Sequence, residues 1–212
     1  MNVATRAITL PGRTRVTGIK KEPVDHAVRV TAPGPKGSAG GGLVGDLVCD
    51  LRHHGGDDQA VYAYAREDLD WWQVELGRTL PDGCFGENMT THGVNISQAL
   101  VGEQWLIGGE LLLQVTVPRV PCSTFQTVIG EKRWVKRFTL RAASGTYLRV
   151  LRAGQVRAGH SIVVVERPDH HISSSMAFRA LTGEPELLAM MVDVPGLPDE
   201  IRQTIERRVP VG

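Results

Sequence analysis

The chain has 212 residues, of which 42% are hydrophobic and 22% charged, and its formal net charge is +1. This composition is typical of a soluble globular protein, and the low net charge argues against general nucleic-acid or membrane binding. The three cysteines form no C-x-x-C pair, so we expect reduced thiols in the cytoplasm. No apolar run reaches the length of a membrane-spanning helix, about 18 residues. The segment Met1 to Thr14 lacks the continuous apolar core of a signal peptide.

The first third of the chain is predicted to contain short strands and then a helix. β-branched residues at Arg15 to Lys20 and at Ala27 to Ala32 predict two strands, separated by a turn. The segment Ala60 to Leu76 carries apolar and aromatic residues at helical spacing, with acidic residues near its start. We therefore expect one helix here that packs on a sheet.

The middle of the chain predicts further strands bounded by glycine-containing turns. These strands are Gln104 to Ile107, Leu111 to Val117, Ser144 to Leu151 and Ser161 to Glu166. Strands that recur at this short spacing predict an antiparallel barrel. Between the second and third of them, Phe125 to Gly130 and Glu131 to Phe138 are expected to be helical.

The character of the chain changes after residue 168. Serines at 173–175 can cap a helix, and prolines at 185 and 198 separate it from two more. The predicted helices are 173–181, 185–191 and 199–209. We therefore expect two units, a β-rich domain over 1–168 and a three-helix appendage over 169–212.

The stretch with the clearest chemistry is Pro118-Arg119-Val120-Pro121-Cys122-Ser123-Thr124. Its two prolines cannot donate to a β-ladder, so strand pairing should end there and the chain should leave the sheet as a stiff loop. A thiol beside a guanidinium and backbone N–H groups shifts toward thiolate from its free pKa of about 8.5. Thiolates attack electrophiles and bind soft metals. The alternative is that Cys122 is a small buried hydrophobe.

Two other polar segments are candidates for a pocket. In His53-His54-Gly55-Gly56 the neighbouring imidazoles would point to opposite faces of a strand, so they cannot both bind one metal. We expect one inward imidazole, with two glycines that let the backbone approach a ligand; the alternative is a solvated turn. In Phe85-Gly86-Glu87-Asn88 the carboxylate and amide either line a pocket or cap neighbouring backbone.

Several motifs in order resemble those of a known family. They are Gly45-Asp46, His53-His54-Gly55-Gly56-Asp57, Phe85-Gly86-Glu87-Asn88-Met89-Thr90-Thr91, Val101-Gly102-Glu103, Pro118-Arg119 with Pro121-Cys122, and Tyr147-Leu148-Arg149-Val150. By these residues the chain resembles the MOSC domain proteins, which are named for the C-terminal region of molybdenum cofactor sulfurases, and in particular their YiiM-like branch. Each motif alone is weak, whereas their common order is specific.

The resemblance implies a mainly β fold, a closed and mostly antiparallel β-barrel with a few peripheral helices, that holds a molybdenum cofactor. Cys122 matches the family's protein ligand to molybdenum, whose other sulfurs come from the pterin dithiolene. The implied cofactor-binding residues are Arg119, Ser123, Thr124, Gly55, Gly56 and Arg149. His54 and Asn88 are expected beside Cys122 as further catalytic residues.

The resemblance also implies an activity, the reduction of small N-hydroxylated compounds such as hydroxylaminopurine bases or amidoxime-like molecules. We expect no flavin, haem or iron–sulfur cluster in this chain, so an external redox partner protein must supply electrons. A homodimer is a further candidate assembly. Two alternatives stay open: a carrier that delivers sulfur or cofactor through a persulfide on Cys122, and a barrel that has lost its chemistry and binds another ligand.

Overall fold

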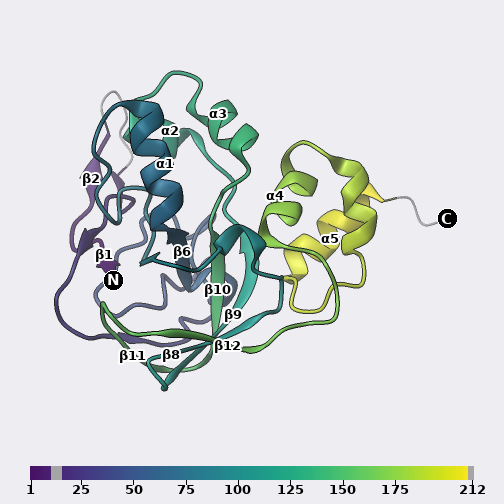
Figure 1. Ribbon diagram of the computed structural model, residues 1–212, viewed down its shortest axis with the longest axis horizontal. Coiled ribbons are helices and arrows are strands. Elements are labelled where there is room, and N and C mark those ends of the chain that lie inside the picture. Colours follow the sequence, from purple (N-terminus) through teal and green to yellow (C-terminus); the bar gives the residue numbers. More distant parts are fainter. Residues whose placement is uncertain (11–15, 210–212) are drawn as a thin grey trace.

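A computed structural model of the chain describes residues 1–10 and 16–209, which are arranged around a six-stranded sheet (Figure 1). In spatial order the strands are β12 (Ile162–Glu166), β8 (Gln104–Ile107), β9 (Leu111–Pro118), β10 (Thr146–Arg152), β6 (Val61–Ala65) and β7 (Met89–Thr91). All neighbours are antiparallel except β6 and β7. Short strands pair beside the sheet: β1 (Asn2–Val3) with β4 (Glu22–Pro23), β2 (Ile8–Thr9) with β3 (Val16–Thr17), and β5 (Val28–Val30) with β11 (Gly154–Val156).

The sheet curls into a half-barrel and does not close. Among the described residues, its edge strands β7 and β12 pair only with their inner neighbours. The prediction of a closed, mainly β barrel is therefore wrong, and the fold is mixed α/β. A barrel closes only when its edge strands meet with matching tilt and stagger. Here β7 is three residues long and parallel to its neighbour, so it offers little edge for closure.

The predicted helix over Ala60 to Leu76 is wrong in its first part. Residues Val61–Ala65 form β6, a strand inside the sheet, and helix α1 (Arg66–Leu76) begins only after it. Every residue of β6 is buried. A strand buried on both faces shows no alternation of polar and apolar residues, so its sequence resembles that of a buried helix. Helix α1 ends at Gly77, which adopts a left-handed conformation with φ 61°.

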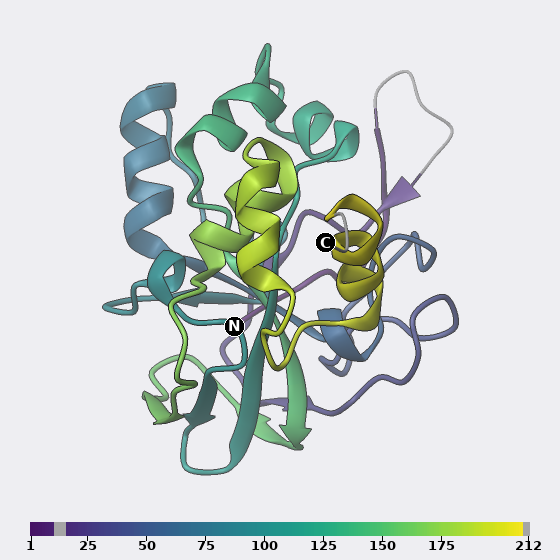
Figure 2. The same cartoon turned by 90° about the vertical axis from the view of Figure 1, so that its right-hand side faces the viewer.

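The predicted hairpin and the C-terminal helices are confirmed. Strands β8 and β9 pair antiparallel around the turn at 108–110, with Trp105 opposite Leu113. The C-terminal helices are α4 (Ser174–Thr182), the 3-10 helix η3 (Pro185–Met191) and α5 (Asp199–Arg208). The Ser173 hydroxyl caps α4 by accepting a hydrogen bond from the Met176 N–H at 3.2 Å. Figure 2 shows α4 and α5 in front of the strands, on the side remote from β1 and β2 in Figure 1.

An aromatic cluster fixes the helices at the other end of the sheet. Helices α2 (Ser123–Ile129) and α3 (Trp134–Arg141) lie beside α1 (Figure 1). The fully buried rings of the cluster include Trp72, Phe125, Trp134 and Phe138 of these helices and Phe85 of the loop before β7, and the Trp72 and Trp134 centroids are 4.5 Å apart. This cluster holds α2, the helix that follows Cys122, against the sheet. None of the helices in the described ranges is long and apolar enough to cross a membrane.

We expect Phe138→Ala to lower the free energy of unfolding by about 3–5 kcal/mol, because it removes a fully buried ring from the centre of this cluster. Leu140→Ala is the matched control, since Leu140 lies on the same helix and is 75% exposed; its effect should stay within about 0.5 kcal/mol. Chemical denaturation measures both. Equal losses in the two variants would contradict the described packing of α3.

Candidate functional site

A cavity of about 550 Å³ lies between the sheet and the loops of the first quarter of the chain. Its lining residues come from segments that are distant in sequence: 16–21, 41–55, 59–62, 86–88 and 119–124, together with Leu10 and with Tyr147 of β10. Because these segments meet only in the folded chain, the cavity depends on the tertiary structure rather than on one motif.

Most of the residues predicted for the site line this cavity, namely His54, Gly55, Asn88, Arg119, Cys122 and Thr124. Ser123 and Gly56 are not among the lining residues. A Cβ at Gly56 would lie 2.7 Å from the Lys36 backbone, so this glycine permits close packing of two loops. Arg149 also lies outside the cavity, and its guanidinium pairs with Asp58 at 2.5 Å.

Cys122 occupies the junction between the sheet and α2. Strand β9 ends at Pro118, as the prolines predicted, and Cys122 is the N-cap residue of α2 in an extended conformation. Its side chain is partly buried and lines the cavity. Cys49 lines the same cavity from the opposite loop, whereas Cys84 lies outside the lining. The position of Cys122 makes its sulfur available to a ligand inside the cavity.

Arg119 places a buried positive charge beside Cys122. The residue is 6% exposed, and its guanidinium carbon lies 4.1 Å from the centroid of Phe125 and 5.0 Å from that of Tyr62. The guanidinium donates a hydrogen bond to the Phe85 carbonyl and forms no salt bridge with any described residue. A guanidinium stays charged in proteins, and a buried charge without a counter-ion is unfavourable. The cavity therefore favours an anion next to Arg119.

A second buried cation, which the sequence did not reveal, comes from Lys21. Its ammonium lies 2.5 Å from both carboxylate oxygens of Asp46, and both side chains are almost fully buried. Burial is the main cause that lowers the pKa of Lys21. Both residues line the cavity. Their partnership joins positions 25 residues apart, and no local pattern marks it.

The amide of Asn88 holds this ion pair to the sheet. Its oxygen accepts a hydrogen bond from the Tyr62 N–H at 3.1 Å, and its nitrogen donates to Asp46 at 2.9 Å. The neighbouring Glu87 is fully buried and accepts hydrogen bonds from the N–H groups of Gly83 and Phe85. Burial raises the pKa of Glu87 to about 7. Glu87 therefore caps neighbouring backbone, and Asn88 has structural partners as well as a place in the cavity wall.

His54 is the inward imidazole of the histidine pair. It lines the cavity, whereas His53 is exposed. Burial, and then the positive charge of Arg119, lower the pKa of His54 to about 4. At neutral pH the imidazole is therefore uncharged, and it can donate one hydrogen bond and accept another.

The chemistry of these groups fits an anionic cofactor that carries its own metal. Cys122 offers a soft sulfur ligand, and Arg119 offers positive charge for an anion, whereas the charge of Lys21 is balanced by Asp46. Across residues 1–10 and 16–209, no three His, Cys, Asp or Glu side chains gather as a metal site.

Comparison with known proteins identifies the family to which this chain belongs. The MOSC domain family pattern matches residues 50–163, and the chain belongs to this family. The crystal structure of YiiM from Geobacillus stearothermophilus has a TM-score of 0.77 and 27% identity, with coverage of 99% of this chain and 96% of that chain. The uncharacterized protein YflK of Bacillus subtilis is 32% identical over 79% of this chain and 72% of its own length.

A longer relative carries a functional name. A protein of Gibberella moniliformis named "Reductase" is 28% identical over 169 residues, which are 78% of this chain. The chain spans only 30% of the length of that relative. The name therefore belongs to a protein that has much sequence outside the shared region.

The pKa of His54 predicts a specific loss of stability in acid. Between about pH 6.5 and pH 4 the unfolded chain binds a proton at His54 that the folded chain does not bind, so stability falls as the pH drops through this range. We expect His54→Gln to lose less stability over this range than the wild type in chemical denaturation. His53→Gln, at the exposed neighbour, should lose as much stability over this pH range as the wild type. An unchanged pH dependence in His54→Gln would contradict the buried environment of His54.

Proposed function

We propose that this protein is a molybdenum-cofactor-dependent reductase of small N-hydroxylated compounds, such as hydroxylaminopurine bases or amidoxime-like molecules, with Cys122 as the protein ligand to molybdenum. The observation that carries the proposal is the buried Arg119, which has no acidic partner in the part of the chain that the structure describes and lies beside Cys122 in the cavity wall. Membership of the MOSC family supports the choice of cofactor.

The cavity supplies the two kinds of contact that such a cofactor needs. The Cys122 thiolate suits molybdenum, and a ligand fixed between a strand end and a helix start has a defined direction. Arg119 can hold an anionic group by charge-assisted hydrogen bonds. The hydroxyl of Thr124 offers a further hydrogen bond from the first turn of α2.

The remaining walls are suited to a small organic substrate. Leu47, Val48 and Leu51 give the cavity apolar lining in addition to its polar groups. His54 is uncharged at neutral pH and can orient an N–OH group by a hydrogen bond, but it holds no extra proton to release. Apolar packing on one side and a few placed polar groups on the other are typical of small-molecule sites.

The cofactor would supply the two-electron redox chemistry that cleaves an N–O bond, with release of water. The residues of this chain would bind and orient the substrate and restrict access of bulk water. Electrons would come from a separate protein. The relative named "Reductase" is consistent with this division, since most of its length lies outside the region that this chain matches.

The direct test is Cys122→Ser, expressed with the wild type in a host supplied with molybdate. We expect near one molybdenum per chain in the wild type and a loss of at least about tenfold in the variant, because the soft ligand is removed. Reduction of hydroxylaminopurine with a chemical reductant should fall in parallel. Cys84→Ser, outside the cavity lining, is the matched control and should keep its metal.

Full activity and metal content in Cys122→Ser would contradict the proposal. A wild type that lacks molybdenum under proven cofactor supply, but carries a persulfide on Cys122, would favour the carrier alternative instead.

A further inference from the structure

Helices α1 and α3, which ion pairs join, both expose large apolar side chains. The two helices run antiparallel, because Arg141 pairs with Asp68 at 3.1 Å and Arg137 approaches Glu75 at 3.9 Å. Near these ion pairs, three apolar residues face solvent: Val74 is 82% exposed, Leu140 75% and Trp71 39%. Contiguous exposed apolar groups of this kind often mark a contact surface. We call Trp71, Val74 and Leu140 the apolar patch.

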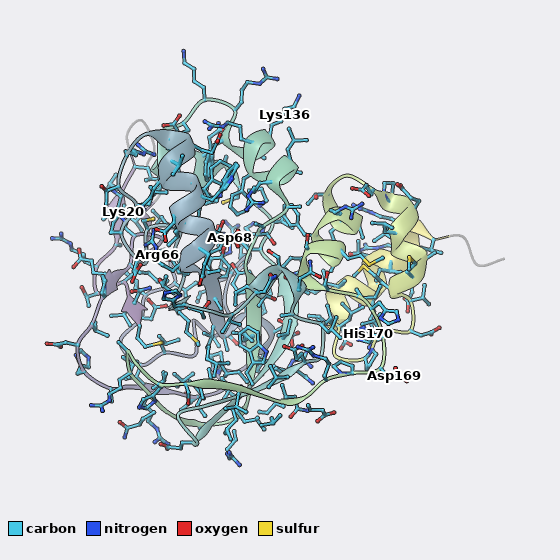
Figure 3. All side chains as sticks on the ribbon, viewed as in Figure 1. Lys20, Arg66, Asp68, Lys136, Asp169 and His170 are labelled. Carbon is cyan, nitrogen blue, oxygen red and sulfur yellow. The ribbon has the colours of Figure 1, made fainter. Side chains whose placement is uncertain are left out.

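Unpaired positive charge borders the apolar patch. Lys132, Arg133 and Lys136 are exposed, and none of them forms a salt bridge with a described residue. Figure 3 shows Lys136 at the outer edge of the molecule, near the helical end. The acidic residues of α1 differ: Asp68, Asp70 and Glu75 each have an arginine within 4 Å, and Glu67 contacts His92 at 2.7 Å. The net uncompensated charge beside the patch is therefore positive.

Packed aromatic rings connect the apolar patch to the cavity. Trp71 contacts Trp72 with a centroid distance of 4.8 Å, and Trp72 contacts Trp134 at 4.5 Å. Trp134 contacts Phe125 at 5.5 Å, and the Arg119 guanidinium lies 4.1 Å from the Phe125 centroid. Arg119 lines the cavity with Cys122. A chain of packed aromatic rings that ends at Arg119 thus links the apolar patch to the candidate redox site.

We propose that the apolar patch, with Lys132, Arg133 and Lys136, is the docking surface for an acidic one-electron carrier protein that reduces the site. This inference rests on the proposed reductase function, which needs an external source of electrons. Positive charge steers an acidic partner toward the surface, and a small apolar centre suits the small interfaces of transient electron-transfer complexes. The aromatic contacts place the docked carrier on the side of the cavity wall that carries Arg119 and Cys122.

The test uses two small acidic carriers, a plant-type [2Fe–2S] ferredoxin and a flavodoxin. Calorimetry at low ionic strength measures their binding to the protein as purified, which needs no loaded cofactor. We expect binding of at least one carrier that weakens with added salt. The double variant Lys132→Glu/Lys136→Glu should weaken it at least about tenfold, since two steering charges are reversed.

The matched control is Arg157→Glu/Arg208→Glu, which makes the same charge change at exposed positions without a salt bridge in the described structure. This control should bind within about twofold of the wild type, since its charges lie outside the surface. In the molybdenum-loaded protein, carrier-driven turnover should fall in the Lys132 and Lys136 variant, while turnover with reduced methyl viologen, a small donor, stays the same. Equal thermal midpoints would show that both variants fold.

The possible failures are distinguishable. No binding of either carrier, or equal weakening by both double variants, would overturn the docking proposal and leave the reductase proposal untouched. No turnover of the loaded wild type with reduced methyl viologen would overturn the reductase proposal, on which the docking proposal rests.

Discussion

The buried guanidinium of Arg119 is the constraint around which this end of the molecule is arranged. It lies between the rings of Phe125 and Tyr62, donates to the Phe85 carbonyl and has no acidic partner among the described residues. Gly86, which follows this carbonyl, permits close packing of Ile19, because a Cβ there would lie 2.9 Å from the Ile19 side chain. A buried charge is tolerated only when other groups stabilise it. The rings of Phe125 and Tyr62 stabilise the charge of Arg119 in part, and an anion in the cavity would neutralise it.

The residues of the site come together only in the folded chain. Lys21, Asp46 and Asn88 come from three separate segments and form one hydrogen-bonded network in the cavity wall. Strand β9 and helix α2 fix the direction of Cys122, while the aromatic cluster holds α2 in place. Some residues therefore both line the cavity and stabilise the fold. A change in the core next to Phe125 would alter both the stability of the fold and the position of Arg119.

Local patterns predicted the parts of the fold that depend on local chemistry. The glycine turn of the β8–β9 hairpin, the Ser173 cap of α4 and the strand end at Pro118 all follow from residue preferences within a few positions. The strand β6 was missed because burial on both faces removes alternation. The open sheet and the Lys21–Asp46 pair were also missed, since both depend on contacts between distant segments. The local sequence already singled out Cys122, which lines the cavity, whereas Arg149, which the family resemblance added, lies outside it.

The proposed function depends on the binding of molybdenum by Cys122 inside this cavity. X-ray absorption at the molybdenum edge of the loaded protein tests this binding, because the method counts sulfur ligands at the metal. We expect one sulfur ligand more in the wild type than the pterin dithiolene supplies, and the loss of that ligand in whatever metal Cys122→Ser retains. The same sulfur count in both proteins would contradict it.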